Sequence, residues 1–140
     1  MKIVSDTLFS QGTQTLENTL NHRLQRQKVI VGNIANAMTP GYRALGYEFE
    51  SQLQKSIDSS KKNQMFATDT RHFRGQGIMG QGDIKADLHV KPTESIGNDG
   101  NTVDSDREMA DLAENQILYN FTVEVLNRRL AMLRYGINGG

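Results

Sequence analysis

Apolar residues recur at alternating intervals of three and four near the C-terminal end of this 140-residue chain. This apolar seam consists of Met109, Leu112, Gln116, Tyr119, Val123, Leu126, Leu130, Leu133 and Ile137, of which only Gln116 is polar. An average spacing of 3.5 residues keeps one stripe of a helix against a second helix over its whole length. The seam therefore predicts a long helix that packs against another long element.

A second stripe with the same alternation lies near the N-terminal end. Its residues are Leu20, Leu24, Gln27, Val31, Ile34 and Met38, with Phe9 and Leu16 extending the apolar face upstream. We expect a helix from about Thr7 to Ala37, which matches the C-terminal helix at roughly 45 Å each. The two helices are expected to pair antiparallel and to leave some apolar residues off the seam for a second layer of partners, namely Ile30, Ala37, Ile117, Phe121 and Val125.

The sequence Thr39-Pro40-Gly41-Tyr42 marks the end of the first helix. Pro40 supplies no N–H and biases Thr39 away from the helical region. Proline followed by glycine suits the two central positions of a type II turn, in which the glycine takes a positive φ. We expect a sharp corner that presents Tyr42.

The C-terminal helix carries signals at both ends. Ser105-Asp106-Arg107-Glu108 matches a capping box, so the helix is expected to begin near Ser105. Gly136 suits a left-handed residue that closes the helix.

The middle of the chain predicts smaller elements. Phe49, Leu53 and Ile57 indicate a short helix from Tyr47 to Ile57, ended by the polar run 58–63. Alternation from Asp83 to Lys91 predicts a half-buried strand, with Ile84, Ala86, Leu88 and Val90 on its buried face. This strand could add to a sheet edge of a neighbouring subunit.

These elements predict a mainly α fold. Two long terminal helices pair as an antiparallel coiled coil, and a short helix and a small, partly extended β and loop segment lie between them. The expected divisions are 1–46 for the first helix and its turn, 47–104 for the short helix, glycine-rich loop and strand, and 105–140 for the heptad helix.

Composition favours a protein partner. Sixteen basic and sixteen acidic residues give a formal net charge of zero, which does not favour nucleic acid or anionic lipid. The absence of cysteine excludes disulfides and thiol catalysis. The first residues lack the apolar core of a secretory signal, so we expect any export to use another route.

No catalytic or cofactor motif withstands scrutiny. Residues 75–80 match the GxGxxG pattern of dinucleotide-binding loops, but no apolar strand precedes them and a strand pattern replaces the following helix. His22, His72 and His89 form no metal-binding pair, and Asp99, Asp104 and Asp106 lack the order of a calcium loop. We expect no enzyme activity, cofactor, metal or small-molecule substrate.

Two stretches of the chain resemble a known family. The sequence from Asn33 to Tyr42, in which Ala35-Asn36 precedes Thr39-Pro40-Gly41-Tyr42 by two residues, resembles the signature of the bacterial flagellar rod and hook axial proteins. The stretch from Asp99 to Met109, followed by Ala113-Glu114-Asn115-Gln116 and Tyr119, looks like the C-terminal block of proximal-rod subunits, and the short middle also fits them. Ser105 departs from the apolar residue usual at that position.

The resemblance implies a structural subunit of the flagellar basal-body rod, which polymerises through its terminal helices and transmits torque across the periplasm. It implies as partners copies of itself, other rod subunits, the adaptor protein that joins rod to ring, and the flagellar type III export apparatus. The heptads alone leave open a coiled-coil adaptor or secretion component outside the rod.

The expected packing and subunit-contact residues lie on both helices. They are Leu20, Leu24, Val31, Asn33, Ile34, Asn36, Leu112, Tyr119, Val123, Leu126, Leu130 and Leu133, and the corner consists of Thr39, Pro40, Gly41 and Tyr42. Asn33 and Asn36 fit equally well as solvated helix residues and as polar contacts between subunits.

Overall fold

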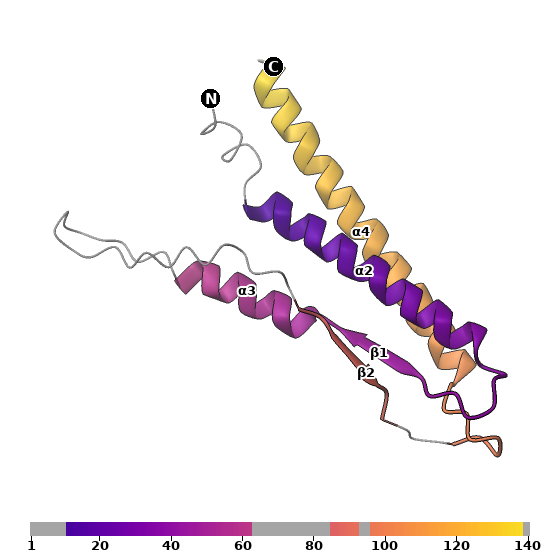
Figure 1. Cartoon of the computed structure of the whole chain (residues 1–140). Helices are drawn as coiled ribbons and strands as arrows, with labels where there is room; N and C mark the ends of the chain where they lie inside the picture. Colours follow the sequence, from indigo (N-terminus) through magenta and orange to yellow (C-terminus); the bar gives the residue numbers. More distant parts are fainter. Residues whose placement is uncertain (1–10, 63–84, 93–95, 139–140) are drawn as a thin grey trace. The chain divides into compact units, whose positions relative to one another are not determined.

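The computed structural model describes residues 11–62, 85–92 and 96–138 (Figure 1). Its elements are α2 (Gln11–Ala35), β1 (Leu45–Glu48), α3 (Glu50–Lys62), β2 (Asp87–Val90) and α4 (Ser105–Asn138). The chain forms two units, one of residues 1–47 with 88–140 and the other of residues 48–87. The expected mainly α fold, with two long helices packed together and a small sheet between them in sequence, is confirmed.

The two long helices run antiparallel within the first unit (Figure 1). Asn115 in α4 bonds the backbone of Arg23 in α2, while Asn101 before α4 bonds the residues that follow α2. Near the other end, a Cβ at Gly12 would overlap the guanidinium of Arg129. The start of α2 therefore lies beside the C-terminal part of α4, and the end of α2 lies beside the segment before α4. The two helices thus form an antiparallel hairpin.

α2 ends at Ala35, two residues before the expected end. Asn36 donates from its side-chain Nδ2 to the carbonyl of Gly32 at 2.8 Å, and its backbone N–H bonds both Gly32 and Asn33. These bonds tighten the last turn and stop the helix before Pro40. The corner then closes as expected, since Tyr42 N–H donates to the Thr39 carbonyl at 3.2 Å and Gly41 has a φ of 70°.

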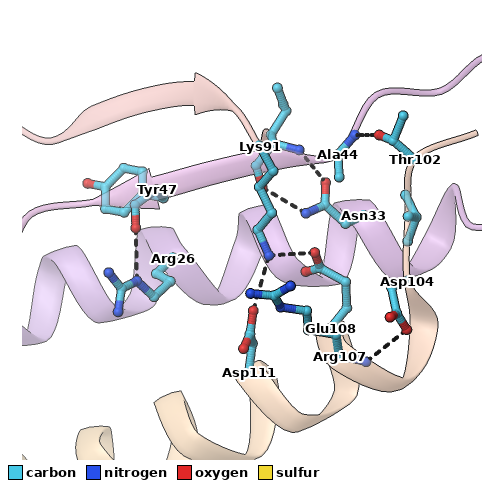
Figure 2. Close-up of polar contacts among 12 residues, drawn as sticks. Arg26, Asn33, Ala44, Tyr47, Lys91, Thr102, Asp104, Arg107, Glu108 and Asp111 are labelled. Atoms are coloured by element: carbon cyan, nitrogen blue, oxygen red, sulfur yellow. Dashed lines mark hydrogen bonds and ion pairs between the residues drawn. The ribbon is translucent and has the colours of Figure 1, made fainter. Parts of the chain in front are cut away.

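α4 begins at Ser105 as expected, but its cap is Asp104. Asp104 Oδ1 accepts from the backbone N–H groups of Asp106 and Arg107, each at 3.1 Å (Figure 2). The predicted capping box is therefore wrong, because Glu108 pairs with Lys91 instead of reaching back to the cap. The expected stop at Gly136 is also wrong, since α4 continues to Asn138.

β1 and β2 form a two-stranded sheet, and the sequence pattern did not indicate β1. The described strand β2 covers only Asp87–Val90, and the expected positions Asp83 and Ile84 lie outside the described residues. The predicted burial holds at Ala86, which is half-buried, but it is reversed from Leu88 onward, because Leu88 and Val90 are exposed whereas His89 between them is half-buried. Gly46 leaves room for the His89 ring, so a Cβ there would lie 2.6 Å from His89 Nε2.

In the second unit, α3 begins at Glu50 and continues to Lys62, so the predicted span Tyr47–Ile57 is wrong at both ends. Tyr47 belongs to β1, and the first helical bond runs from Leu53 N–H to the Phe49 carbonyl at 2.9 Å. Gln54 donates to both carboxylate oxygens of Asp58 one turn later, which supports the helix through the polar run.

Candidate assembly surface and the polar joint

The residues of α4 that α2 covers most completely are polar. Glu108 and Asn115 are each 2% exposed and Thr122 is 7% exposed, at intervals of seven residues. Asn115 bonds α2, and Arg129, seven residues beyond Thr122, lies against Gly12. This polar flank, defined as Glu108, Asn115, Thr122 and Arg129, is offset by one residue from the a positions of the predicted seam.

The predicted packing residues of α4 fall into two groups. Leu112, Tyr119, Val123, Leu126 and Leu133 are half-buried. Leu130 is 39% exposed, and the seam residues Met109 and Ile137 are more exposed still. The single chain thus leaves one side of the predicted seam open.

The predicted residues of α2 divide in the same way. Leu20, Ile34 and Asn36 are half-buried and Asn33 is completely buried, while Leu24 and Val31 are exposed. Ile30, which we expected off the seam, is buried, so that prediction is wrong. Met38 beside the corner is also exposed, which extends the open apolar surface of this helix.

A second apolar stripe lies on the side of α4 that points away from α2. We define this outer stripe as Ile117, Phe121, Met132 and Tyr135, which are 64% to 75% exposed. Two residues advance a helix by about 200°, so Ile117 lies opposite Asn115. The sequence predicted that Ile117 and Phe121 would remain off the seam, and it missed Met132 and Tyr135. Apolar side chains on both sides of one helix require more than one packing partner.

Asn33 joins α2 to β1. Its Nδ2 donates to the Leu45 carbonyl at 2.8 Å, and its Oδ1 accepts from Leu45 N–H at 3.0 Å, so both bonds reach the backbone of β1 (Figure 2). Its Oδ1 also accepts from the Tyr42 hydroxyl at 3.3 Å. The amide thus pairs with the strand as a neighbouring strand would. Of the two interpretations left open for Asn33, the solvated one does not fit a completely buried side chain.

Asn101 joins the end of α2 to the segment before α4. Its Nδ2 donates at 2.9 Å to the carbonyls of Asn36, Ala37 and Thr39, which have no helical partner once α2 has ended. Its Oδ1 accepts from Val103 N–H at 2.8 Å. The side chain is buried, and its bonds add to those that the Asn36 and Thr39 carbonyls already accept from the N–H groups of Thr39 and Tyr42.

An ion pair ties β2 to the first turns of α4. Lys91 Nζ lies 2.6 Å from Glu108 Oε1 and 3.1 Å from Asp111 Oδ2 (Figure 2). Burial lowers the pKa of Lys91, but hydrogen bonds and charges from Glu108 and Asp111 outweigh it, so the pKa is raised above its ordinary value. Lys91 N–H also donates to the Ala44 carbonyl at 2.8 Å.

Tyr47 connects β1 to the middle of α2. Its hydroxyl lies 2.8 Å from His22 Nδ1, and its carbonyl accepts from Arg26 Nε at 2.9 Å. Burial raises the pKa of the Tyr47 phenol, and the charge of Arg26 partly opposes that rise. Arg26 and Asn33 together cover the edge of β1 that faces α2.

Within residues 11–62, 85–92 and 96–138, no group of three His, Asp or Glu side chains is placed to hold a metal ion. In the same ranges, no helix has the length and apolar content needed to cross a bilayer. The GxGxxG sequence at 75–80 lies outside the described residues.

The chain is similar in sequence to known proteins. A family model described as flagella basal body rod protein matches residues 14–43, which cover most of α2 and the corner. The chain is 36% identical over 134 residues to flagellar basal body rod protein FlgB of Bacillus subtilis (strain 168), covering 96% of this chain and 98% of the relative. It is 35% identical to the protein of that name from Escherichia coli (strain K12), covering 81% and 83%. For the Salmonella typhimurium (strain LT2) protein of that name, identity is 33%, covering 89% and 91%.

Proposed function

Because this chain belongs to the flagellar basal body rod protein family, we propose that it polymerises through its terminal helices into the proximal part of the rod. Members of this family are structural components of the rod and not enzymes. The proposal includes transmission of torque across the periplasm by packed helices. Its partners would be copies of itself, other rod subunits and the rod-to-ring adaptor, with delivery by the flagellar type III export apparatus.

One observation carries the proposal: large apolar residues are exposed on the side of α4 that points away from α2, before and after the Glu124–Arg128 ion pair. Ile117 and Phe121 are 68% and 64% exposed, although they lie one turn apart on the same side of the helix. Large apolar side chains in such a stripe are stabilised when a second protein surface removes them from water. Unlike surfaces that meet head to tail, by a rotation that does not close, build a helical tube.

The outer stripe provides the test. We expect the double variant Ile117→Ser/Phe121→Ser to abolish swimming and to lower the number of rods in purified basal bodies, because the neighbour-facing apolar area is lost. The thermal unfolding of the free chain should change little, since both side chains are already in water.

Asn127→Ser is the matched control, because Asn127 is exposed and polar on the same helix. It should swim as the wild type does. Normal rods in the double variant would contradict the proposal, and electron microscopy that places the chain outside the tube would favour an adaptor or a secretion component.

A further inference from the structure

Asn115 is buried at a cost in stability, so stability alone does not explain why an asparagine occupies this position. It is 2% exposed, and its Nδ2 donates to the Arg23 carbonyl of α2 at 3.0 Å. Its Oδ1 is buried with no hydrogen-bond partner among the described residues. A buried acceptor without a partner destabilises the fold, and apolar residues often replace such groups without loss.

Two overlapping faces of α4 are suited to pack against α2. Both share Leu112, Tyr119, Leu126 and Leu133. The face observed against α2 adds the polar flank, Glu108, Asn115, Thr122 and Arg129, whereas the alternative face adds Met109, Gln116, Val123 and Leu130 on the other side of the shared residues. Hydrophobic burial alone favours the alternative face, because it would remove more apolar area from water.

We propose that Asn115 is a positioning residue that fixes the rotation of α4 about its axis on α2. Its bond joins a side chain of one helix to the backbone of the other, so it forms only when the polar flank points inward. Buried asparagines select one arrangement of paired helices at a cost in stability in just this way.

Thr122 and Glu108 do not supply this restraint in the middle of α4. Thr122 Oγ1 donates at 2.7 Å to the Leu118 carbonyl of its own helix, so its bond is the same in either rotation. The Lys91–Glu108 pair acts at the first turns of α4, far along the helix from Leu130 and Ile137. Asn115 lies between the two ends and touches α2 directly.

The consequence concerns assembly, and this part of the inference rests on the proposed function. With α4 held in this rotation, Met109, Leu130 and Ile137 stay exposed and add to the outer stripe as surface for neighbouring copies. If α4 were rotated so that the alternative face met α2, this surface would be buried within the single chain.

Cysteine labelling of the free, full-length chain tests the rotation, because the natural sequence has no cysteine. Two single-cysteine probes are used, Thr122→Cys on the buried polar flank and Leu130→Cys on the exposed side. Each is combined with Asn115→Ala and reacted with a maleimide. Loss of one net hydrogen bond shifts the balance of two rotations by up to about tenfold.

We expect Asn115→Ala to accelerate labelling at Thr122→Cys up to about tenfold and to slow it at Leu130→Cys. Opposite changes are the signature of rotation, whereas loosening of the fold would accelerate both probes. Acceleration of both, or no change in either, would overturn the inference. Glu114→Ala, at an exposed neighbouring position that lies on neither face, is the control and should leave both rates unchanged. The labelling uses unassembled chain, so its outcome is independent of whether the chain builds rods.

Discussion

At the scale of single residues, three buried asparagines define the joint between the long helices. Asn33 bonds the backbone of β1, Asn101 bonds the carbonyls after α2, and Asn115 bonds the backbone of α2 itself. A side-chain amide can donate and accept at once, so it substitutes for missing backbone partners at places where regular structure stops. Asn33 was among the expected contact residues, whereas Asn101 and Asn115 look like ordinary polar residues in the sequence.

Gly41 is predicted to be required by its backbone conformation. Its φ is 70° and no atom lies near the position of an added Cβ, so Gly41→Ala should introduce strain without a clash. We expect a loss of about 1 to 2 kcal/mol in the free energy of unfolding, measured by urea denaturation. Gly32→Ala is the matched control, because Gly32 lies inside α2 with open space and should gain up to about 1 kcal/mol. Equal effects of the two changes would contradict the role of the corner.

The ion pair predicts how stability depends on pH. The pKa of Lys91 is raised in the folded chain, so the folded state keeps its proton at a pH where the unfolded chain has lost it. The contribution of Lys91 to the free energy of unfolding is therefore complete below the pKa of lysine in the unfolded chain, about 10.4. It is lost as the pH rises through the pKa of Lys91 in the folded chain. The raised pKa of Tyr47 acts in the same direction.

We expect urea denaturation at pH 9 and above pH 10, roughly the range where lysine titrates, to show falling stability. The double variant Lys91→Met/Glu108→Leu should weaken that fall without leaving a buried charge unpaired. Lys28→Met, at an exposed position of α2, should retain it. An unchanged pH profile in the double variant would refute the assignment.

At the scale of elements, α4 shows why periodicity predicts a helix better than it predicts a contact. The apolar seam and the polar flank have the same seven-residue period and differ by one position. Period identifies a helix with a partner, but the side that meets the partner depends on both helices. The shared residues Leu112, Tyr119, Leu126 and Leu133 belong to both sides.

Leu130 separates packing within the chain from packing in the assembly. It is 39% exposed in the free chain, so Leu130→Ala should cost about 1 kcal/mol in urea denaturation, below the 2 to 5 kcal/mol typical of a fully buried leucine. We expect a larger effect on the number of rods in basal bodies. Leu126→Ala, at a half-buried position, should cost the free chain more. The reverse order of costs would show that Leu130 serves the hairpin alone.

At the scale of the whole molecule, the hairpin unit places polar groups in its helix interface and large apolar groups outside it. Glu108 and Asn115 are buried while Ile117 and Phe121 are in water, the opposite of the usual order in a stable monomer. A structural component of the flagellar rod can tolerate this order if neighbouring subunits complete the packing.

The sequence by itself determined the mainly α fold, both long helices, the Thr39–Tyr42 corner and the start of α4 at Ser105. These features depend on local signals, such as heptad spacing, a Pro-Gly pair and caps, which act over a few neighbouring residues. The resemblance in two short stretches was sufficient to indicate the family that the comparisons then showed.

Only the tertiary structure decided which side of α4 meets α2, which side chain bonds the carbonyls after α2, and which partner β2 takes. Each depends on a bond between residues far apart in sequence: Asn115 with Arg23, Asn101 with Asn36, and Lys91 with Ala44. The sequence does not indicate the partner of a polar side chain, because that partner is defined only when the chain brings a distant backbone group to it.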